Sequence, residues 1–339
     1  MQNIKLYEIY DERHILVFSN NILYFEEVQD DLSLKCLSSS DGFFDIIQIL
    51  KYADKKFLFL LPNLIALIPL EENLDVGELL SDFSSKNYNF FKAINLPKGK
   101  IAVSTFNSNI LIFNILLNND IQLQTKIDMN NNNTKYFTFS LDLYYVEKTN
   151  ELLIRDMEKI FFLNLEKYCF NHVIKEENNY YLWGSEYTIG RNSLENNFCM
   201  INDDLLAMTF TRNVIKLIDL NTHEIIKNFI YSHDNITSLI KPKNFEKNNF
   251  LCSLYSYDCH GGIYFSFSKA NIIEYGRKKE DYPENFGIEY TDKISLFEFP
   301  VSIRLLRDGV VLMICFNSGC FDNKFSLRIL KYNLNIISP

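Results

Sequence analysis

Glycine and proline are scarce in this sequence, which has only 11 Gly and 7 Pro among 339 residues. Soluble proteins use roughly 7% glycine and roughly 5% proline, so the chain has less than half the usual supply of these turn formers. Asparagine is abundant, and it tolerates the left-handed backbone region better than other residues that carry a side chain. We therefore expect asparagine to form many of the turns.

The chain also lacks long apolar runs and an excess of positive charge. A bilayer-spanning helix needs about 20 apolar residues, and the longest candidate, residues 57–70, is shorter and contains Pro62 and Asn63. The first residues, MQNIKLYEIYDER, lack the basic start and apolar core of a secretory signal. The net charge of −9 gives no general phosphate-binding surface. The sequence therefore predicts a cytoplasmic protein, or alternatively a nuclear one, with no membrane insertion and no nucleic-acid partner.

The cysteines follow no metal-binding or disulfide pattern. There are 7, without a CxxC pair, which is typical of free thiols in a reducing compartment. Only Cys259, His260 and Cys320, all near expected turns, could converge, although structural zinc sites usually pair ligands closely in sequence. The motifs GxSxG and HExxH and a glycine-rich phosphate loop are also missing. The sequence predicts no catalytic residue, no metal and no cofactor.

Apolar and aromatic residues are plentiful, with 47% hydrophobic residues, 29 Phe and 20 Tyr. Isoleucine, phenylalanine and tyrosine favour strands. Residues 213–229, NVIKLIDLNTHEIIKNF, place a polar Asn-Thr-His-Glu turn between two apolar runs, which is typical of a β-hairpin. The first run, residues 214–220, is apolar at nearly every position, so we expect it to be buried on both faces.

The same pattern of strand, tight polar turn and apolar strand occurs seven times, at intervals of about 40 to 60 residues. Further candidate strands before and after each hairpin bring most units to about four strands, which is the pattern of a β-propeller blade. The hairpins span residues 15–25, 57–70, 101–116, 152–165, 205–220, 250–267 and 310–330.

The sequence thus predicts a single all-β domain, a seven-bladed β-propeller with about four antiparallel strands per blade. A large β-sandwich or two small β-domains is the alternative, and residues 75–83 are the best candidate for a helix. We expect the ring to close by contact between the first and last blades, with a displaced N-terminal strand as the alternative. The predicted blades span residues 1–40, 41–84, 85–130, 131–176, 195–232, 233–275 and 294–339, with insertions at 177–194 and 276–293.

Residues 213–239 resemble one repeat of the WD-repeat propeller family. Asp219 matches the aspartate of that family, and Ile218 stands where its tryptophan usually is. His233 matches the family's histidine, with Ser232 in place of the preceding glycine. The other six units share only the strand pattern. The resemblance implies a seven-bladed interaction platform, in which His233 and Asp219 belong to a structural hydrogen-bond network.

The two insertions supply the candidate partner-binding residues. The first contains the only tryptophan, and aromatic and arginine side chains are enriched at interaction hot spots. The second is highly charged and expected to be exposed. Packing of the first insertion against the domain, and simple solvation of the second, are the alternatives. The candidates are Tyr180, Tyr181, Trp183, Arg191, Arg277, Lys278 and Lys279.

We expect a non-enzymatic scaffold that binds other proteins as a subunit of a larger, eukaryotic hetero-complex. One alternative is a propeller-fold hydrolase with ionisable residues converging at the central channel. The other is a coat or tethering subunit in membrane traffic, which would carry a C-terminal helical solenoid.

Overall fold

The computed structural model of the chain describes residues 4–70, 77–129, 142–155, 159–175, 198–209, 214–230, 234–241, 251–256, 264–266, 298–317 and 324–331. The elements whose bounds lie within these ranges are strands, β1 to β26. Within the same ranges, no helix is long and apolar enough to cross a membrane.

The strands pair into seven antiparallel sheets, each following chain order. The first two sheets contain β1 (Ile4–Ile9), β2 (His14–Ser19), β3 (Ile22–Val28) and β4 (Leu34–Ser40), then β5 (Gln48–Ala53), β6 (Lys56–Leu61), β7 (Leu64–Pro69) and β8 (Ser81–Ser84). The third and fourth contain β9 (Phe90–Leu96), β10 (Lys100–Thr105), β11 (Asn109–Ile115) and β12 (Ile121–Asp128), then β13 (Asp142–Val146), β14 (Glu151–Arg155), β15 (Lys159–Asn164) and β16 (Cys169–Lys175).

The last three sheets complete the arrangement. The fifth contains β17 (Phe198–Asn202), β18 (Leu205–Thr209), β19 (Val214–Asp219) and β20 (Glu224–Ile230). The sixth and seventh have three described strands each, namely β21 (Asp234–Ile240), β22 (Leu251–Ser256) and β23 (Tyr264–Ser266), then β24 (Glu298–Arg307), β25 (Val310–Asn317) and β26 (Lys324–Lys331). The outer strand expected at residues 334–337 lies outside the described residues.

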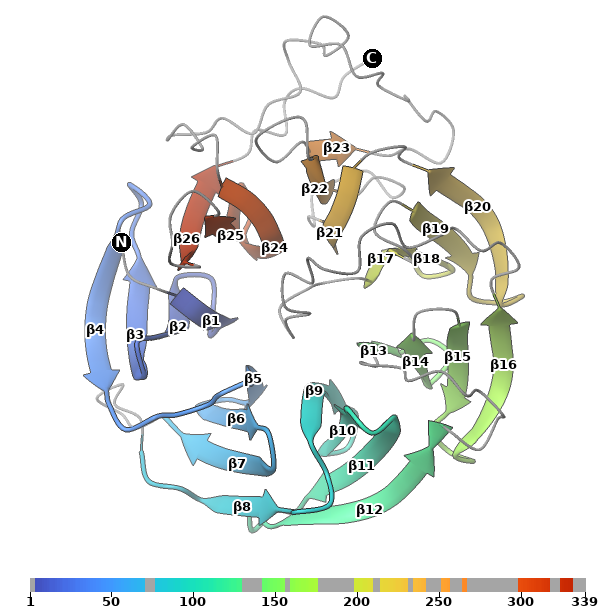
Figure 1. Cartoon of the computed structure of the whole chain (residues 1–339), viewed down its shortest axis with the longest axis horizontal. Coiled ribbons are helices and arrows are strands. Elements are labelled where there is room, and N and C mark those ends of the chain that lie inside the picture. Colours follow the sequence, from blue (N-terminus) through green and yellow to red (C-terminus); the bar gives the residue numbers. More distant parts are fainter. Residues whose placement is uncertain are drawn as a thin grey trace, which may run out of the picture.

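The sheets stand around a common centre, with the first strand of each sheet innermost and the last strand at the periphery (Figure 1). This arrangement is a β-propeller, so the predicted all-β propeller of antiparallel sheets is confirmed. The sandwich alternative is wrong.

Stacking of neighbouring sheets explains why the middle strands show no alternation of polar and apolar residues. In β10, Ile101 and Val103 pack in a core cluster with residues of the second sheet, whereas Ala102 packs in another cluster with residues of the fourth. Both faces of such a strand therefore lie against protein, and burial of both favours an unbroken apolar run. The peripheral strand β12, by contrast, exposes Gln122 and Gln124.

Two local predictions need correction. The helix expected at residues 75–83 is wrong over its described part, because residues 81–83 lie in β8 and residues 77–80 form no regular element. In the turn between β19 and β20, the residue with positive φ is His223, at 57°, and not an asparagine. Asparagine does take this conformation in other turns, at Asn20, Asn21, Asn119 and Asn150.

The first and last sheets meet directly. β1 pairs with β2 and so belongs to the first sheet, which makes the alternative of a displaced N-terminal strand wrong. Side chains of the two sheets share one core cluster, which includes Leu16 from β2 and Leu312 from β25. Arg304 of β24 also donates from Nη1 to Glu8 Oε2 of β1 at 2.6 Å.

The antiparallel order divides the turns between two rims of the ring. Turns that join the first to the second strand of a sheet, or the third to the fourth, lie on one side, which we call the first rim. Turns that join the second to the third strand, and the crossings to the next sheet, lie on the other side, the second rim.

Candidate functional site

The predicted contact residues of the two insertions all lie outside the described part of the chain. These are Tyr180, Tyr181, Trp183, Arg191, Arg277, Lys278 and Lys279. Cys259, His260 and Cys320 also lie outside it. Their proposed roles, or absence of roles, therefore remain predictions.

Asp219 has a local role at the end of β19. Its Oδ1 accepts hydrogen bonds from the backbone N–H groups of Asn221 and Thr222, at 2.8 and 3.1 Å. A carboxylate that bonds the following backbone in this way fixes a turn. The expected network partner, His233, lies outside the described residues.

Polar side chains on or directly beside the two inner strands of each sheet join it to the next. Arg304 in the seventh sheet pairs with Glu8 in the first, and Glu8 Oε1 also accepts from the Lys51 backbone N–H in the second. The remaining links are Gln48 with Ala93, Lys92 with Asp142, Arg155 with Thr209, Lys241 with Ile201, and Ser238 with Ile303. These groups are thus engaged in holding neighbouring sheets together.

A second layer of contacts joins the fourth and fifth sheets at the first rim. The Glu151 side chain is almost fully buried, and it accepts from His223 Nε2 at 3.0 Å and from Asn171 Nδ2 at 2.7 Å. The His223 ring also stacks on His172, with centroids 5.6 Å apart. A buried carboxylate needs such partners, because an unpaired one would lose its hydration without compensation.

Burial is the main cause of the pKa shifts of three groups on or beside the inner strands, Tyr144, Cys199 and Lys241. It raises the pKa of Tyr144 and of Cys199 to about 12. Burial also lowers the pKa of Lys241, whose Nζ donates to the Ile201 carbonyl of β17. The phenol and the thiol stay protonated at neutral pH, which is the opposite of what a catalytic nucleophile needs.

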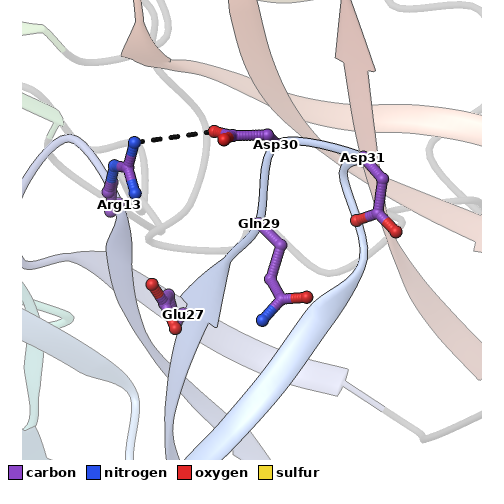
Figure 2. Close-up of a pocket in the computed structure, with 5 residues that line it drawn as sticks. All are labelled: Arg13, Glu27, Gln29, Asp30 and Asp31. Atoms are coloured by element: carbon purple, nitrogen blue, oxygen red, sulfur yellow. Dashed lines mark ion pairs between the residues drawn. The ribbon is translucent and has the colours of Figure 1, made fainter.

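A shallow polar hollow of ≈ 340 Å³ lies on the first rim of the first sheet (Figure 2). Its lining residues are Arg13, Glu27, Gln29, Asp30 and Asp31. Asp31 is engaged with Ser33, and Asp30 lies 3.6 Å from Arg13 Nη2.

The hollow adjoins the junction between the first and seventh sheets. Arg307 donates from Nη1 to the Glu12 carbonyl at 3.1 Å, and its Nη2 lies 3.9 Å from Asp30 Oδ1. Asp30, at the edge of the hollow, therefore takes part in the contacts between the first and seventh sheets. Within the described ranges, no group of three or more His, Cys, Asp or Glu side chains could hold a metal ion.

Exposed leucines lie elsewhere on the first rim, in two loops where the second and third sheets meet. Leu79 and Leu80 precede β8 and are 52% and 40% exposed, while Leu116 and Leu117 follow β11 and are 39% and fully exposed. The Ser81 hydroxyl donates to the Asn119 carbonyl and so joins the two loops. We call these four residues the leucine cluster.

The loop that carries Leu116 and Leu117 has a fixed shape. The backbone N–H of Leu116 donates to the Asp120 carbonyl at 2.9 Å, and that of Asn119 donates to the Leu116 carbonyl at 2.8 Å. Lys56 Nζ donates to Asn119 Oδ1 at 2.8 Å and anchors the loop to the second sheet. The leucine side chains are therefore presented by an ordered turn and not by an unconstrained one.

Sequence reasoning missed the leucine cluster. It assigned Leu116 to the end of a strand and residues 75–83 to a helix, so these leucines were expected to contribute to regular structure. The available signal was two Leu-Leu pairs, in ELLSD and NILLNND, immediately beside the polar residues of a turn. Large apolar residues at such positions are exposed unless another element covers them.

Comparison with known proteins gives a match at the level of the fold. No protein-family model matches the chain, and no curated protein sequence matches it. Among solved structures, the chain is similar to Sqt1 of Saccharomyces cerevisiae, with a TM-score of 0.55 and 12% sequence identity. The match covers 95% of this chain and 82% of Sqt1. At this identity the likeness shows the β-propeller fold alone.

Proposed function

We propose that this β-propeller is a non-enzymatic scaffold that binds other proteins, as a subunit of a larger complex in the cytoplasm or nucleus. Each of its seven sheets then corresponds to one blade. The observation that carries the proposal is the leucine cluster, four exposed leucines in two loops of one rim that a hydrogen bond joins.

Physical chemistry favours a protein partner for such a surface. Exposed apolar side chains that gather in one place mark interaction sites, whereas single exposed ones are common and carry no such meaning. Burying one leucine side chain contributes about 1.5–3 kcal/mol, so covering even two of them gives substantial binding energy. Turns on a rigid propeller are also well placed to contact a partner without a change in the fold.

Recovery of partners from native lysate tests this proposal. The double variant Leu79→Ser/Leu117→Ser removes the apolar contact without touching the core. Phe44→Ser is the matched control, because Phe44 is 62% exposed and lies in the crossing between the first and second sheets, on the second rim. We expect one or more proteins to be recovered with the wild type and the control but not with the double variant. Equal recovery with all three would contradict the leucine cluster as the contact surface.

The first insertion is a separate proposed contact. Its aromatic residues Tyr180, Tyr181 and Trp183 and its Arg191 have the composition of interaction hot spots. Deleting residues 178–192 and repeating the recovery experiment tests it independently of the leucine cluster. Unchanged recovery would remove this insertion as a contact.

A further inference from the structure

The pairing between the third and fourth strands of a sheet is interrupted at a position that recurs around the ring. In the first, third, fourth and fifth sheets, the fourth strand has one extra residue opposite the junction between the fourth and fifth residues of the third strand. Such an extra residue is a β-bulge. We call these residues the outer bulges, and they are Leu37 in β4, Gln124 in β12, Asn171 in β16 and Ile226 in β20.

The second sheet is interrupted at the same position in another way. β8 pairs with β7 only along Leu64 to Leu67, the first four residues of β7. Beyond them, the N–H groups of Leu80 and Gly77 donate to the carbonyls of Leu67 and Pro69, at 2.9 and 3.0 Å, but residues 77–80 form no regular strand. All five sheets with four described strands therefore share this interruption.

The side chains of the outer bulges have no common chemistry. Leu37 is half-buried, whereas Gln124 and Ile226 are exposed. Asn171 donates from Nδ2 to Glu151 Oε1 at 2.7 Å. What recurs is an extra residue in the backbone, and not a side chain that could hold a ligand. The effect shared by the four bulges is therefore an effect on the backbone of the outer strands.

An extra residue changes what an outer strand presents to another molecule. Every second residue of a strand directs its N–H and C=O groups away from the neighbouring strand, and one extra residue shifts this alternation. A straight strand could therefore pair with only one side of the bulge. Each uninterrupted piece has four residues or fewer, such as residues 121–123 and 125–128 of β12. An ordinary strand has about five or six residues.

The outer strands have features that would otherwise favour pairing with another chain. They lie at the periphery of the ring, and among the described strands none pairs with their outer side (Figure 1). Leu34 of β4, Leu123 of β12 and Ile226 of β20 are 38%, 37% and 51% exposed. Exposed lysines on edge strands oppose such pairing, as bulges do. Each of the four bulged strands carries one, namely Lys35, Lys126, Lys175 and Lys227.

We infer that the outer bulges prevent the outer strands from pairing with those of a second copy of this chain. A second copy is the relevant molecule, because it presents the same exposed edges at the same concentration. The inference is independent of the proposed function. It concerns the circumference of the ring, whereas the proposed contacts with other proteins lie in its loops.

Removing an outer bulge tests this inference. Deletion of Gln124 leaves Leu123 and Thr125 adjacent, so that all of β12 can pair with β11 in one register. Deletion of Ile226 has the same effect in β20. The matched controls Gln124→Ala and Ile226→Ser change the side chain but keep the extra residue. Sedimentation velocity over a dilution series measures self-association, and amide hydrogen exchange locates the contact.

The wild type and both controls are expected to remain monomeric. The deletion variants should self-associate, with a rise of about twofold or more in apparent mass and new protection from exchange in β12 or β20. The Ile226 comparison is the more decisive, because its deletion also removes an exposed apolar side chain. Association driven by apolar surface alone would therefore not increase.

Circular dichroism and thermal melts establish whether the deletion variants are folded. Folded deletion variants that stay monomeric would overturn the inference, and so would self-association without new protection in the outer strands. A wild-type dimer that protects these strands would overturn it as well. If both deletions prevented folding, the extra residue would be needed by the sheet itself and not by its outer edge, which also contradicts the inference.

Discussion

Glu26 in β3 has a carboxyl group that is poorly compensated in the folded protein. The residue is 5% exposed, and its Oε2 has no hydrogen-bond partner among the described residues. Burial raises its pKa above the ordinary value. The folded protein therefore tolerates the protonated form of Glu26 better than the ionised form. The free energy of unfolding is highest where Glu26 is protonated, and it decreases as the pH rises through the pKa that Glu26 has in the folded protein.

Glu26→Gln should consequently stabilise the protein at neutral pH and have little effect near pH 4. The expected gain is about 1 kcal/mol, because the amide avoids the desolvation of a buried charge. Urea unfolding at the two pH values measures it, with Glu12→Gln as the exposed control. An equal change at both pH values would show that the carboxylate charge is not the cause.

The strands are the elements that could be predicted best from the sequence. Continuous apolar runs such as those in β10 and β11 identify buried strands, because both faces lie against neighbouring sheets. β8 could not be predicted, since its sequence SDFS is short, polar and paired only with β7. The leucine cluster was missed for a related reason, because exposure depends on which loops meet and not on local sequence. The insertions and His233 lie outside the described residues, so those predictions stay open.

The turn between β19 and β20 gives an element-scale prediction. Asp219 Oδ1 accepts two backbone N–H groups there, so Asp219→Ala should lower the free energy of unfolding by about 1–2 kcal/mol. Asp219→Asn keeps the acceptor oxygen and should retain most of the stability. Denaturant unfolding of both variants makes the comparison. If the asparagine variant is destabilised as much as the alanine variant, the hydrogen bonds to the turn are not what matters.

At the scale of the whole molecule, closure of the ring depends on side chains from the first and seventh sheets. The Glu8 side chain is only 7% exposed, and the nearby Glu8 charge raises the pKa of Arg304 even though burial alone would lower it. The pair thus stabilises both charges in a partly desolvated position. Arg307 adds hydrogen bonds to carbonyls of the first sheet.

Arg304→Met should therefore destabilise the protein by about 3 kcal/mol, because it leaves the Glu8 carboxylate buried with less compensation. The double variant Glu8→Gln/Arg304→Met should recover part of this loss, since it removes the charge as well as its partner. Equilibrium unfolding gives the magnitudes, and amide hydrogen exchange in β1 and β24 shows where protection is lost. A loss below about 1 kcal/mol for the single variant would mean that the pair contributes little to closure.

Pairing of β1 with β2, and not with a strand of the seventh sheet, has a mechanical consequence. Force applied between β1 and β26 would act on packed apolar side chains and a few charged contacts, because the described strands of these two sheets share no backbone ladder that could resist it. The contact between the described strands of the first and seventh sheets is therefore where the ring would open before any individual sheet unfolds.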